Sequence, residues 1–210
     1  MSEALCLNSE CQLHRWEEIE IISTERKDKI GKCNFYFGMI EVTKQITEYE
    51  KRREKDKTLI STHQLQLPPQ KFKTQSLWFE IPQDFILYLK EKNYDFHGSI
   101  HATEHAIIGI FPVEVTCDRW DIGGYSFPFH KQTEKPTIFI YDGYPGGVGI
   151  SKKGFERIGK ILILAKESVE KCSCEMGCPS CIQSPKCGNN NKPLDKKGCI
   201  KLLKLISESI

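Results

Sequence analysis

The sequence has no long run of apolar residues and no recognisable export segment. No stretch approaches the roughly 18 apolar residues that a membrane-spanning helix needs. The opening residues, MSEALCLNSE, show neither the basic nor the apolar region of a secretory signal. We therefore expect a cytoplasmic protein with no membrane partner. In that reducing compartment its ten cysteines would bind metal or stay as thiols rather than form disulfides.

The chain also lacks the phosphate-binding fingerprints of nucleotide enzymes. Residues 142–149 form a glycine-rich turn between an apolar β-rich run and a helix, a setting in which backbone N–H groups can bind phosphate. The turn contains neither G-x4-G-K-[ST] nor G-x-G-x-x-G. We therefore expect no ATPase motor in this chain and no enzyme activity of the chain on its own.

The chain has almost no excess of charge of one sign. The formal net charge is only +2, and 39% of the residues are hydrophobic and 28% charged, as in an ordinary globular protein. One local exception is residues 50–57, eight consecutive charged residues of which five are basic. Such a run is typical of a solvated loop or a frayed helix. The alternative is contact with nucleic-acid phosphates through Lys51, Arg52 and Arg53.

Hydrophobic periodicity predicts an α+β fold. Alternating residues indicate strands at 16–22, 33–42 and 58–67, with a turn at Gly31 and Lys32. An apolar run at 137–141 indicates a buried strand. Helical spacing indicates helices over 82–92, 98–111, 151–170 and from Asp195 onward, and we expect a short strand at 113–116.

These elements predict two parts that pack as one unit. Residues 1–75 would form a β-rich N-terminal part, an antiparallel meander. Residues 76–210 would form a mixed α/β region, in which a four-cysteine zinc knuckle lies between the two C-terminal helices.

The zinc prediction comes from residues 171–191, KCSCEMGCPSCIQSPKCGNNN, which contain five cysteines. A C-x2-C pair on a tight turn can supply two corners of a thiolate tetrahedron around one structural Zn²⁺. A disulfide cluster and an iron–sulfur cluster are the alternatives. The five candidates are Cys172, Cys174, Cys178, Cys181 and Cys187. The last three have the firmer spacing, and we favour Cys174 over Cys172 for the fourth position.

A second motif allows a different function. His101, Glu104 and His105 match H-x-x-E-H, the zinc motif of inverted zinc peptidases. A metal-dependent hydrolase would use two imidazoles as ligands, Glu104 as general base and a distal carboxylate as third ligand. The competing interpretation is that these are packed polar residues, hydrogen-bonded to Asp118 or Asp121.

The ordered motifs resemble a known family. The string CSCEMGCPSCIQSPKCGNNNKPLDK resembles the signature of the C-terminal zinc-binding (MZB) domain of mitomycin repair factor-type superfamily 2 DNA helicases. HATEHAII, CDRWDIGG and IFIYDGYPGGVG precede it in the family's order, and the resemblance covers about residues 35–210.

The resemblance implies an accessory, helicase-associated domain that helps a motor hold single-stranded DNA during 3′ to 5′ unwinding in DNA repair. It also implies that four of the five cysteines bind the zinc and that H-x-x-E-H belongs to the family pattern. The motor would lie in the same longer protein, or in a separate protein as in prokaryotic DNA defence systems. Candidate DNA contacts beyond the basic run are Trp120, Lys152, Lys153 and Arg157.

Overall fold

The computed structural model describes residues 9–208 and contains two compact units. The first eight residues, whose sequence predicts no export signal, lie outside that range. Strands β1 (Ser9–Ile30) and β2 (Cys33–Arg53) form a long hairpin and contribute to both units. Its turn lies at Gly31 and Lys32, as predicted, and Gly31 has a φ of 57°.

The smaller unit contains the described residues up to 19 together with 42–71. Here β3 (Leu59–Gln64) pairs antiparallel with β2, with Glu48 opposite Gln64. The run of eight charged residues is neither a loop throughout nor a helix, because β2 continues to Arg53 before the chain turns. The backbone N–H of Lys57 closes that turn on the carbonyl of Arg53 at 2.9 Å.

In the larger unit, residues 20–41 and 72 onward, the sheet order is β1-β2-β4-β6-β5. Strand β4 (Gln70–Glu80) and β5 (Ile122–His130) pair antiparallel with β6 (Lys135–Asp142). Every residue of β6 after its first is buried, which confirms the buried strand predicted at 137–141. The sequence did not indicate β5, because Gly123, Gly124 and Pro128 are typical of turns.

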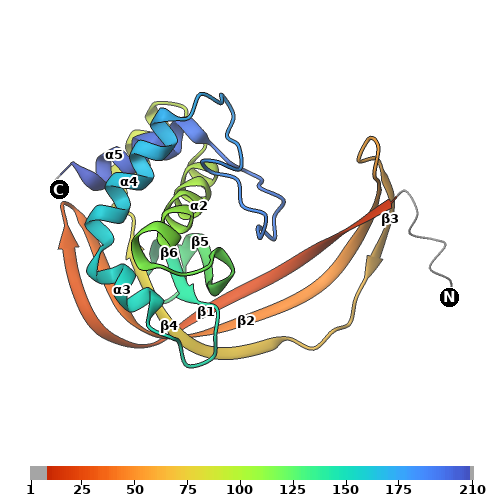
Figure 1. The fold of residues 1–210 in the computed structure, drawn as a ribbon, viewed down its shortest axis with the longest axis horizontal. Helices are drawn as coiled ribbons and strands as arrows, with labels where there is room; N and C mark the ends of the chain where they lie inside the picture. The colour runs from red at the N-terminus through yellow and green to blue at the C-terminus, as the bar shows by residue number, and fades with distance from the viewer. Residues whose placement is uncertain (1–8, 209–210) are drawn as a thin grey trace. The chain divides into compact units, whose positions relative to one another are not determined.

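Five α-helices complete the described part of this unit, and four of them are labelled in Figure 1. They are α1 (Gln83–Glu91), α2 (Phe96–Val115), α3 (Ile150–Glu156), α4 (Ile158–Lys171) and α5 (Lys196–Ser207). α2 contacts α4, α5, β5 and β6, and its buried residues occur on all sides, as expected for a helix inside a core. Between residues 9 and 208, no helix is long and apolar enough to cross a membrane.

Two helix boundaries differ from prediction. α2 continues through Pro112 to Val115, so the strand predicted at 113–116 is the last turn of a helix. The helix predicted over 151–170 is two helices, because the backbone of Arg157 leaves the helical region with a φ of −115°. The last helix begins as predicted, and the Asp195 side chain accepts a hydrogen bond from the N–H of Gly198.

Glycines allow α2 to approach its neighbours closely. A Cβ at Gly98 of α2 would lie 2.8 Å from the backbone nitrogen of Asp195, and one at Gly198 of α5 would lie 1.9 Å from Ser99 Oγ. A Cβ at Gly124 of β5 would lie 2.5 Å from Ile108 Cδ1. The α2–α5 crossing and the α2–sheet contact therefore both depend on positions without a side chain.

We predict that Gly38→Ala lowers the free energy of unfolding by about 1–3 kcal/mol, because the new methyl must displace backbone. The alanine Cβ at position 38 would lie 2.0 Å from the carbonyl oxygen of Ser23 on β1. The measurement is urea unfolding. Gly109→Ala is the control: its Cβ would meet nothing closer than 3.8 Å, and alanine favours the helix. Equal stability of the two variants would contradict the predicted clash.

Candidate metal centre

Four of the predicted cysteines converge where α4 ends. Cys172 is the C-cap of α4, and its Sγ lies 3.5 Å from Cys174 Sγ and 3.5 Å from Cys178 Sγ. Cys181 Sγ lies 3.5 Å from Cys174 Sγ and 3.8 Å from Cys178 Sγ. Zn–S bonds near 2.3 Å in a tetrahedron place sulfurs about 3.8 Å apart, so the four donors fit one zinc ion. They form a single structural zinc site without an open position for substrate.

A tight turn produces the C-x2-C half of this site. The backbone N–H groups of Cys181 and Ile182 both donate to the carbonyl of Cys178, at 3.0 and 3.2 Å. The N–H of Cys178 in turn lies 3.3 Å from Cys181 Sγ, a contact that stabilises a thiolate. Gly177 precedes the turn with a φ of 99°, a conformation that other residues rarely adopt.

Lys196 connects the site to α5, and the sequence reasoning did not identify it. Its ammonium donates to the carbonyls of Cys172 (2.6 Å) and Cys174 (2.5 Å) and lies 3.4 Å from Cys174 Sγ. Burial lowers the pKa of Lys196, but the hydrogen bond to Cys174 and that sulfur's charge outweigh burial and raise it overall. The zinc site thus lies between the last two helices, as predicted, and a charged lysine at the start of α5 contacts it.

The structure differs from the prediction at Cys187. Cys172 and Cys174 both belong to the four-sulfur cluster, and the spare cysteine is Cys187. Hydrogen bonds between Ser184 and Asn191 close the intervening loop on itself, with Ser184 N–H donating to Asn191 Oδ1 at 2.7 Å. This loop carries Cys187 to helix α2, where its Sγ lies 3.3 Å from His101 Nε2.

The two histidines of α2 lie one helical turn apart with ring centroids 4.4 Å apart. Neither bonds to an aspartate, which corrects the expected partners: His101 Nδ1 lies 2.8 Å from the Pro193 carbonyl, and His105 Nδ1 lies 2.7 Å from the Ile182 carbonyl. Burial lowers the pKa of His105 to about 4, with the His101 charge as the next cause, and burial also lowers the pKa of His101. Both rings are therefore neutral at pH 7.

The predicted aspartate partners have another role. Asp118 and Asp121 cap the short helix η2 (Arg119–Asp121) reciprocally: the Asp118 side chain accepts from Trp120 N–H, and the Asp121 side chain accepts from Asp118 N–H.

Glu104 does not join the two histidines. Its Oε1 would lie 2.9 Å from a Cβ at Gly124, so the side chain is directed at β5. Among the described residues, the group that completes a potential metal-binding trio with His101 and His105 is the thiol of Cys187, not a carboxylate. The arrangement that an inverted zinc peptidase requires is therefore not formed here.

The glycine-rich turn binds an anion that belongs to the protein itself. The fully buried carboxylate of Asp142 accepts hydrogen bonds from the backbone N–H groups of Val148 (2.7 Å), Gly149 (2.8 Å) and Ser151 (2.7 Å). These are the donors that a phosphate would need. The Asp142 carboxylate thus uses the N–H donors that a bound phosphate would need, and its hydrogen bonds fix the start of α3.

Trp120 in η2 is the one aromatic residue among the candidate DNA contacts, and it is 67% exposed. Lys186 Nζ lies 5.5 Å from its ring centroid and donates to the carbonyls of Arg119 (2.7 Å) and Ile122. The cysteine loop therefore supports η2 through Lys186, a residue that sequence reasoning passed over.

The basic candidates are distributed between both units and are mostly paired. Arg157 bonds to the Glu114 carbonyl (3.2 Å) and carboxylate (3.4 Å), and Lys153 Nζ lies 3.4 Å from the Val115 carbonyl, whereas Lys152 is an exposed residue of α3. In the smaller unit, Lys51 lies near the end of β2 with two arginines beside it. Ion pairs hold those arginines: Arg52 with Glu50 at 2.6 Å, and Arg53 with Asp56 at 3.3 Å.

We predict that Cys178→Ser or Cys181→Ser releases the zinc of the four-cysteine site. A structural zinc site contributes about 10–16 kcal/mol of binding free energy, so the melting temperature should fall as well. Elemental analysis and thermal unfolding measure the two effects. Cys117→Ser is the control, since that thiol belongs to neither metal-binding group. Unchanged zinc content in the Cys178 and Cys181 variants would refute the assignment.

The comparisons with known proteins agree with this geometry. Residues 103–182 match the family model of the MrfA Zn-binding domain, MZB. An uncharacterized protein of Methanocaldococcus jannaschii, MJ1572.1, is 44% identical over 112 residues, which cover 51% of this chain and all of that protein.

Longer relatives are named as helicases. The ATP-dependent helicase hrq1 of Schizosaccharomyces pombe is 28% identical over 88% of this chain. The uncharacterized ATP-dependent helicase YprA of Bacillus subtilis is 29% identical over 79% of it. The chain spans only 19% and 22% of these two proteins.

The fold is also similar to part of a helicase of known structure. A crystal structure of the DUF1998 helicase MrfA bound to DNA superposes with a TM-score of 0.66 at 24% identity, over 96% of this chain and 26% of that one. A second, bound to DNA and AMPPNP, gives 0.58 at 25% identity over 94% of this chain and 23% of the other. The MZB family-model match, the MJ1572.1 relative and the cysteine geometry show that the chain belongs to the MrfA Zn-binding domain family.

Proposed function

We propose that the chain is a zinc-stabilised accessory domain that acts with a superfamily 2 helicase motor on single-stranded DNA, in cytoplasmic DNA repair or defence. The supporting observation is that this zinc-binding domain recurs in much longer relatives named as ATP-dependent helicases. A related helicase has also been crystallised bound to DNA. The motor would be supplied by the rest of a longer protein or by a partner, and the chain itself would serve as a non-catalytic module.

The DNA-contacting surface that we propose is centred on Trp120. Its exposed indole lies on η2, and Lys186 lies near its face. Tyr144, 47% exposed, donates from its hydroxyl to Asp121 Oδ1 at 2.7 Å. Gly143 allows the backbone before Tyr144 to approach the backbone of η2, since a Cβ added at this position would lie 3.3 Å from the Trp120 carbonyl oxygen. Two exposed aromatic residues on neighbouring backbones suit stacking with unpaired bases, which does not depend on sequence.

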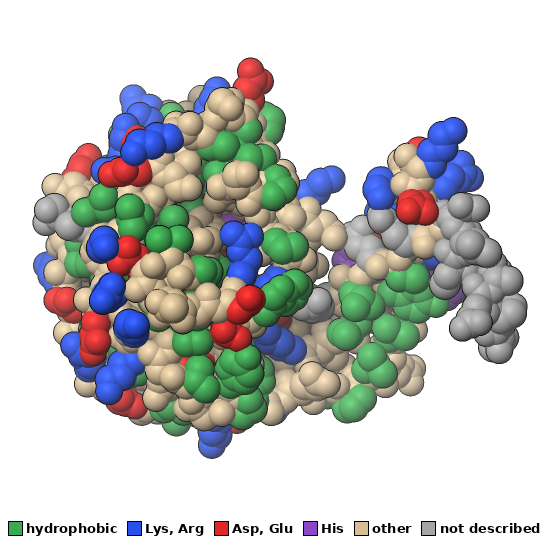
Figure 2. Space-filling model, in the orientation of Figure 1, with side chains coloured by type: hydrophobic (Ala, Val, Ile, Leu, Met, Phe, Trp, Pro, Cys, Tyr) green, Lys and Arg blue, Asp and Glu red, His purple; other side chains and the backbone are tan. Residues whose placement is uncertain are grey.

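The charge distribution also favours stacking over a broad phosphate-binding field. Over the helical part of the larger unit, Figure 2 shows basic and acidic side chains interspersed rather than separated. Lys152 and Lys153 on α3, and Lys51, Arg52 and Arg53 near the end of β2, would add individual phosphate contacts. Because Arg52 and Arg53 already pair with acidic residues, each would have to exchange its partner for a phosphate.

We predict that Trp120→Ala weakens binding of a fluorescently labelled single strand by about 1–3 kcal/mol, the range for one base stacked on an aromatic ring. Fluorescence anisotropy at low salt measures it. Phe129→Ala is a matched control, because that ring is 63% exposed on β5 and belongs to no proposed contact. Undetectable binding by the unmodified chain, or equal loss in both variants, would reject the proposed DNA surface.

A helicase motor should also associate with the chain when the two are separate proteins. We expect tagged chain to co-purify from source cells with an ATPase of superfamily 2, identified by mass spectrometry. The zinc-free Cys178→Ser variant should retain less of it than Cys117→Ser, because losing zinc loosens the α4–α5 junction. If no such ATPase co-purifies and the natural protein contains no motor, the accessory role is wrong.

A further inference from the structure

Three potential metal donors converge between α2 and the loop that follows the zinc site. Cys187 Sγ lies 3.3 Å from His101 Nε2, and the donor atoms of His101, His105 and Cys187 all lie within 4.8 Å of one another. A tetrahedral ion with a Zn–S bond near 2.3 Å and a Zn–N bond near 2.0 Å would separate sulfur and nitrogen by about 3.5 Å. The observed separation is close to that value.

The backbone orients both imidazoles for such a role. A carbonyl oxygen can only accept a hydrogen bond, so His101 Nδ1 and His105 Nδ1 must be the donors to Pro193 and Ile182. In a neutral ring this leaves Nε2 with its lone pair available. Metal-binding histidines usually have their other ring nitrogen fixed in this way by a carbonyl or carboxylate.

The thiol has the surroundings of a thiolate ligand. The backbone N–H of Asn191 lies 3.3 Å from Cys187 Sγ. The same kind of contact, at the same distance, occurs in the four-cysteine site between Cys178 N–H and Cys181 Sγ. One soft sulfur and two imidazoles suit Zn²⁺ and its transition-metal neighbours and disfavour Mg²⁺ and Ca²⁺, which bind oxygen ligands.

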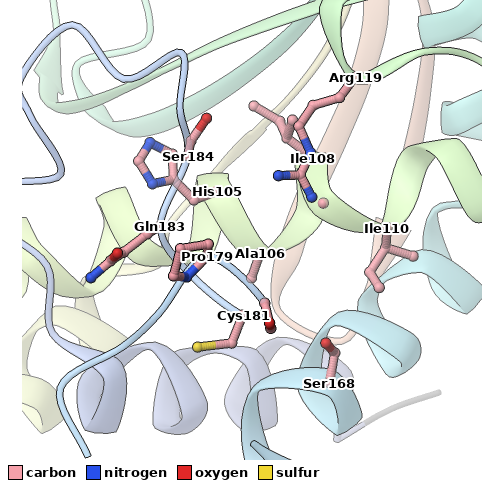
Figure 3. Close-up of a pocket in the computed structure, with 12 residues that line it drawn as sticks. His105, Ala106, Ile108, Ile110, Arg119, Ser168, Pro179, Cys181, Gln183 and Ser184 are labelled. Atoms are coloured by element: carbon pink, nitrogen blue, oxygen red, sulfur yellow. The ribbon is translucent and has the colours of Figure 1, made fainter. Parts of the chain in front are cut away.

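We propose that His101, His105 and Cys187 bind a second zinc-class ion, separate from the four-cysteine site. Three protein ligands leave a fourth position for water or an anion. A small cavity borders His105, and Arg119, Gln183 and Ser184 also line it (Figure 3). An anion that entered this cavity would meet the positive charge of the Arg119 guanidinium.

The ion would join α2 to the loop after Cys181. The four-cysteine site holds the end of α4 and, through Lys196, the start of α5, but it contains no residue of α2. The second ion would therefore connect α2 with the loop that supports η2 through Lys186. The zinc ion of the four-cysteine site does not make this connection. Binding of this second ion would require neither DNA nor a motor.

The competing explanation is a hydrogen bond in which the Cys187 thiol donates to His101 Nε2 and no metal binds. Zinc stoichiometry separates the two. We expect the full chain, loaded with excess Zn²⁺ and gel-filtered, to retain two zinc ions, and Cys187→Ser and His105→Gln to retain one each. Cys117→Ser, the control, should retain two. One ion in the unmodified chain, or two in the Cys187 and His105 variants, overturns the proposal.

Cobalt substitution gives a readout that needs no variant, in case a substitution prevents folding. Titrating the unmodified metal-free chain with Co²⁺ should show two binding phases. The sulfur-to-cobalt charge-transfer absorbance per ion should be about a quarter as large in the one-thiolate phase as in the four-thiolate phase. Saturation at one equivalent, or two phases of equal absorbance per ion, would overturn the second site and would leave the four-cysteine assignment intact.

Discussion

The burial of α2 is the constraint on which the rest of the larger unit depends. This helix has buried residues all round, so the sheet must cover part of it and α4 and α5 the rest (Figure 1). Gly98, Gly124 and Gly198 make the contacts close enough to exclude water. The polar atoms of His101 and His105 are buried in consequence, and each Nδ1 finds a backbone carbonyl: Ile182 in the cysteine-rich segment for His105, and Pro193 just after that segment for His101.

Local signals in the sequence predicted local features of the site. The C-x2-C turn, the cap at Asp195 and the apolar run of β6 each act over a few residues, and each is confirmed in the structure. Long-range partners were not predictable in the same way. Cys187 follows closely after the other four cysteines, and nothing near it in the chain indicates that its neighbour is His101, 86 residues away. Spacing alone therefore favoured Cys187 as a zinc ligand.

Composition misled the prediction where tertiary packing overrides it. Gly123 and Gly124 are typical of a turn, yet they lie in strand β5, where the absence of a side chain admits Tyr141 and α2. The turn at 142–149 has glycines suited to phosphate binding, and the donors are indeed present, but the buried Asp142 carboxylate takes them. A glycine-rich turn after a strand therefore indicates an anion-binding backbone without indicating whose anion it binds.

The position of Lys196 has an electrostatic consequence. Four thiolates around one divalent cation leave two net negative charges in a half-buried cluster, and the Lys196 ammonium, only 7% exposed, compensates one of them. With Lys196 beside it, the four-cysteine centre would thus carry one net negative charge, and without this lysine it would carry two.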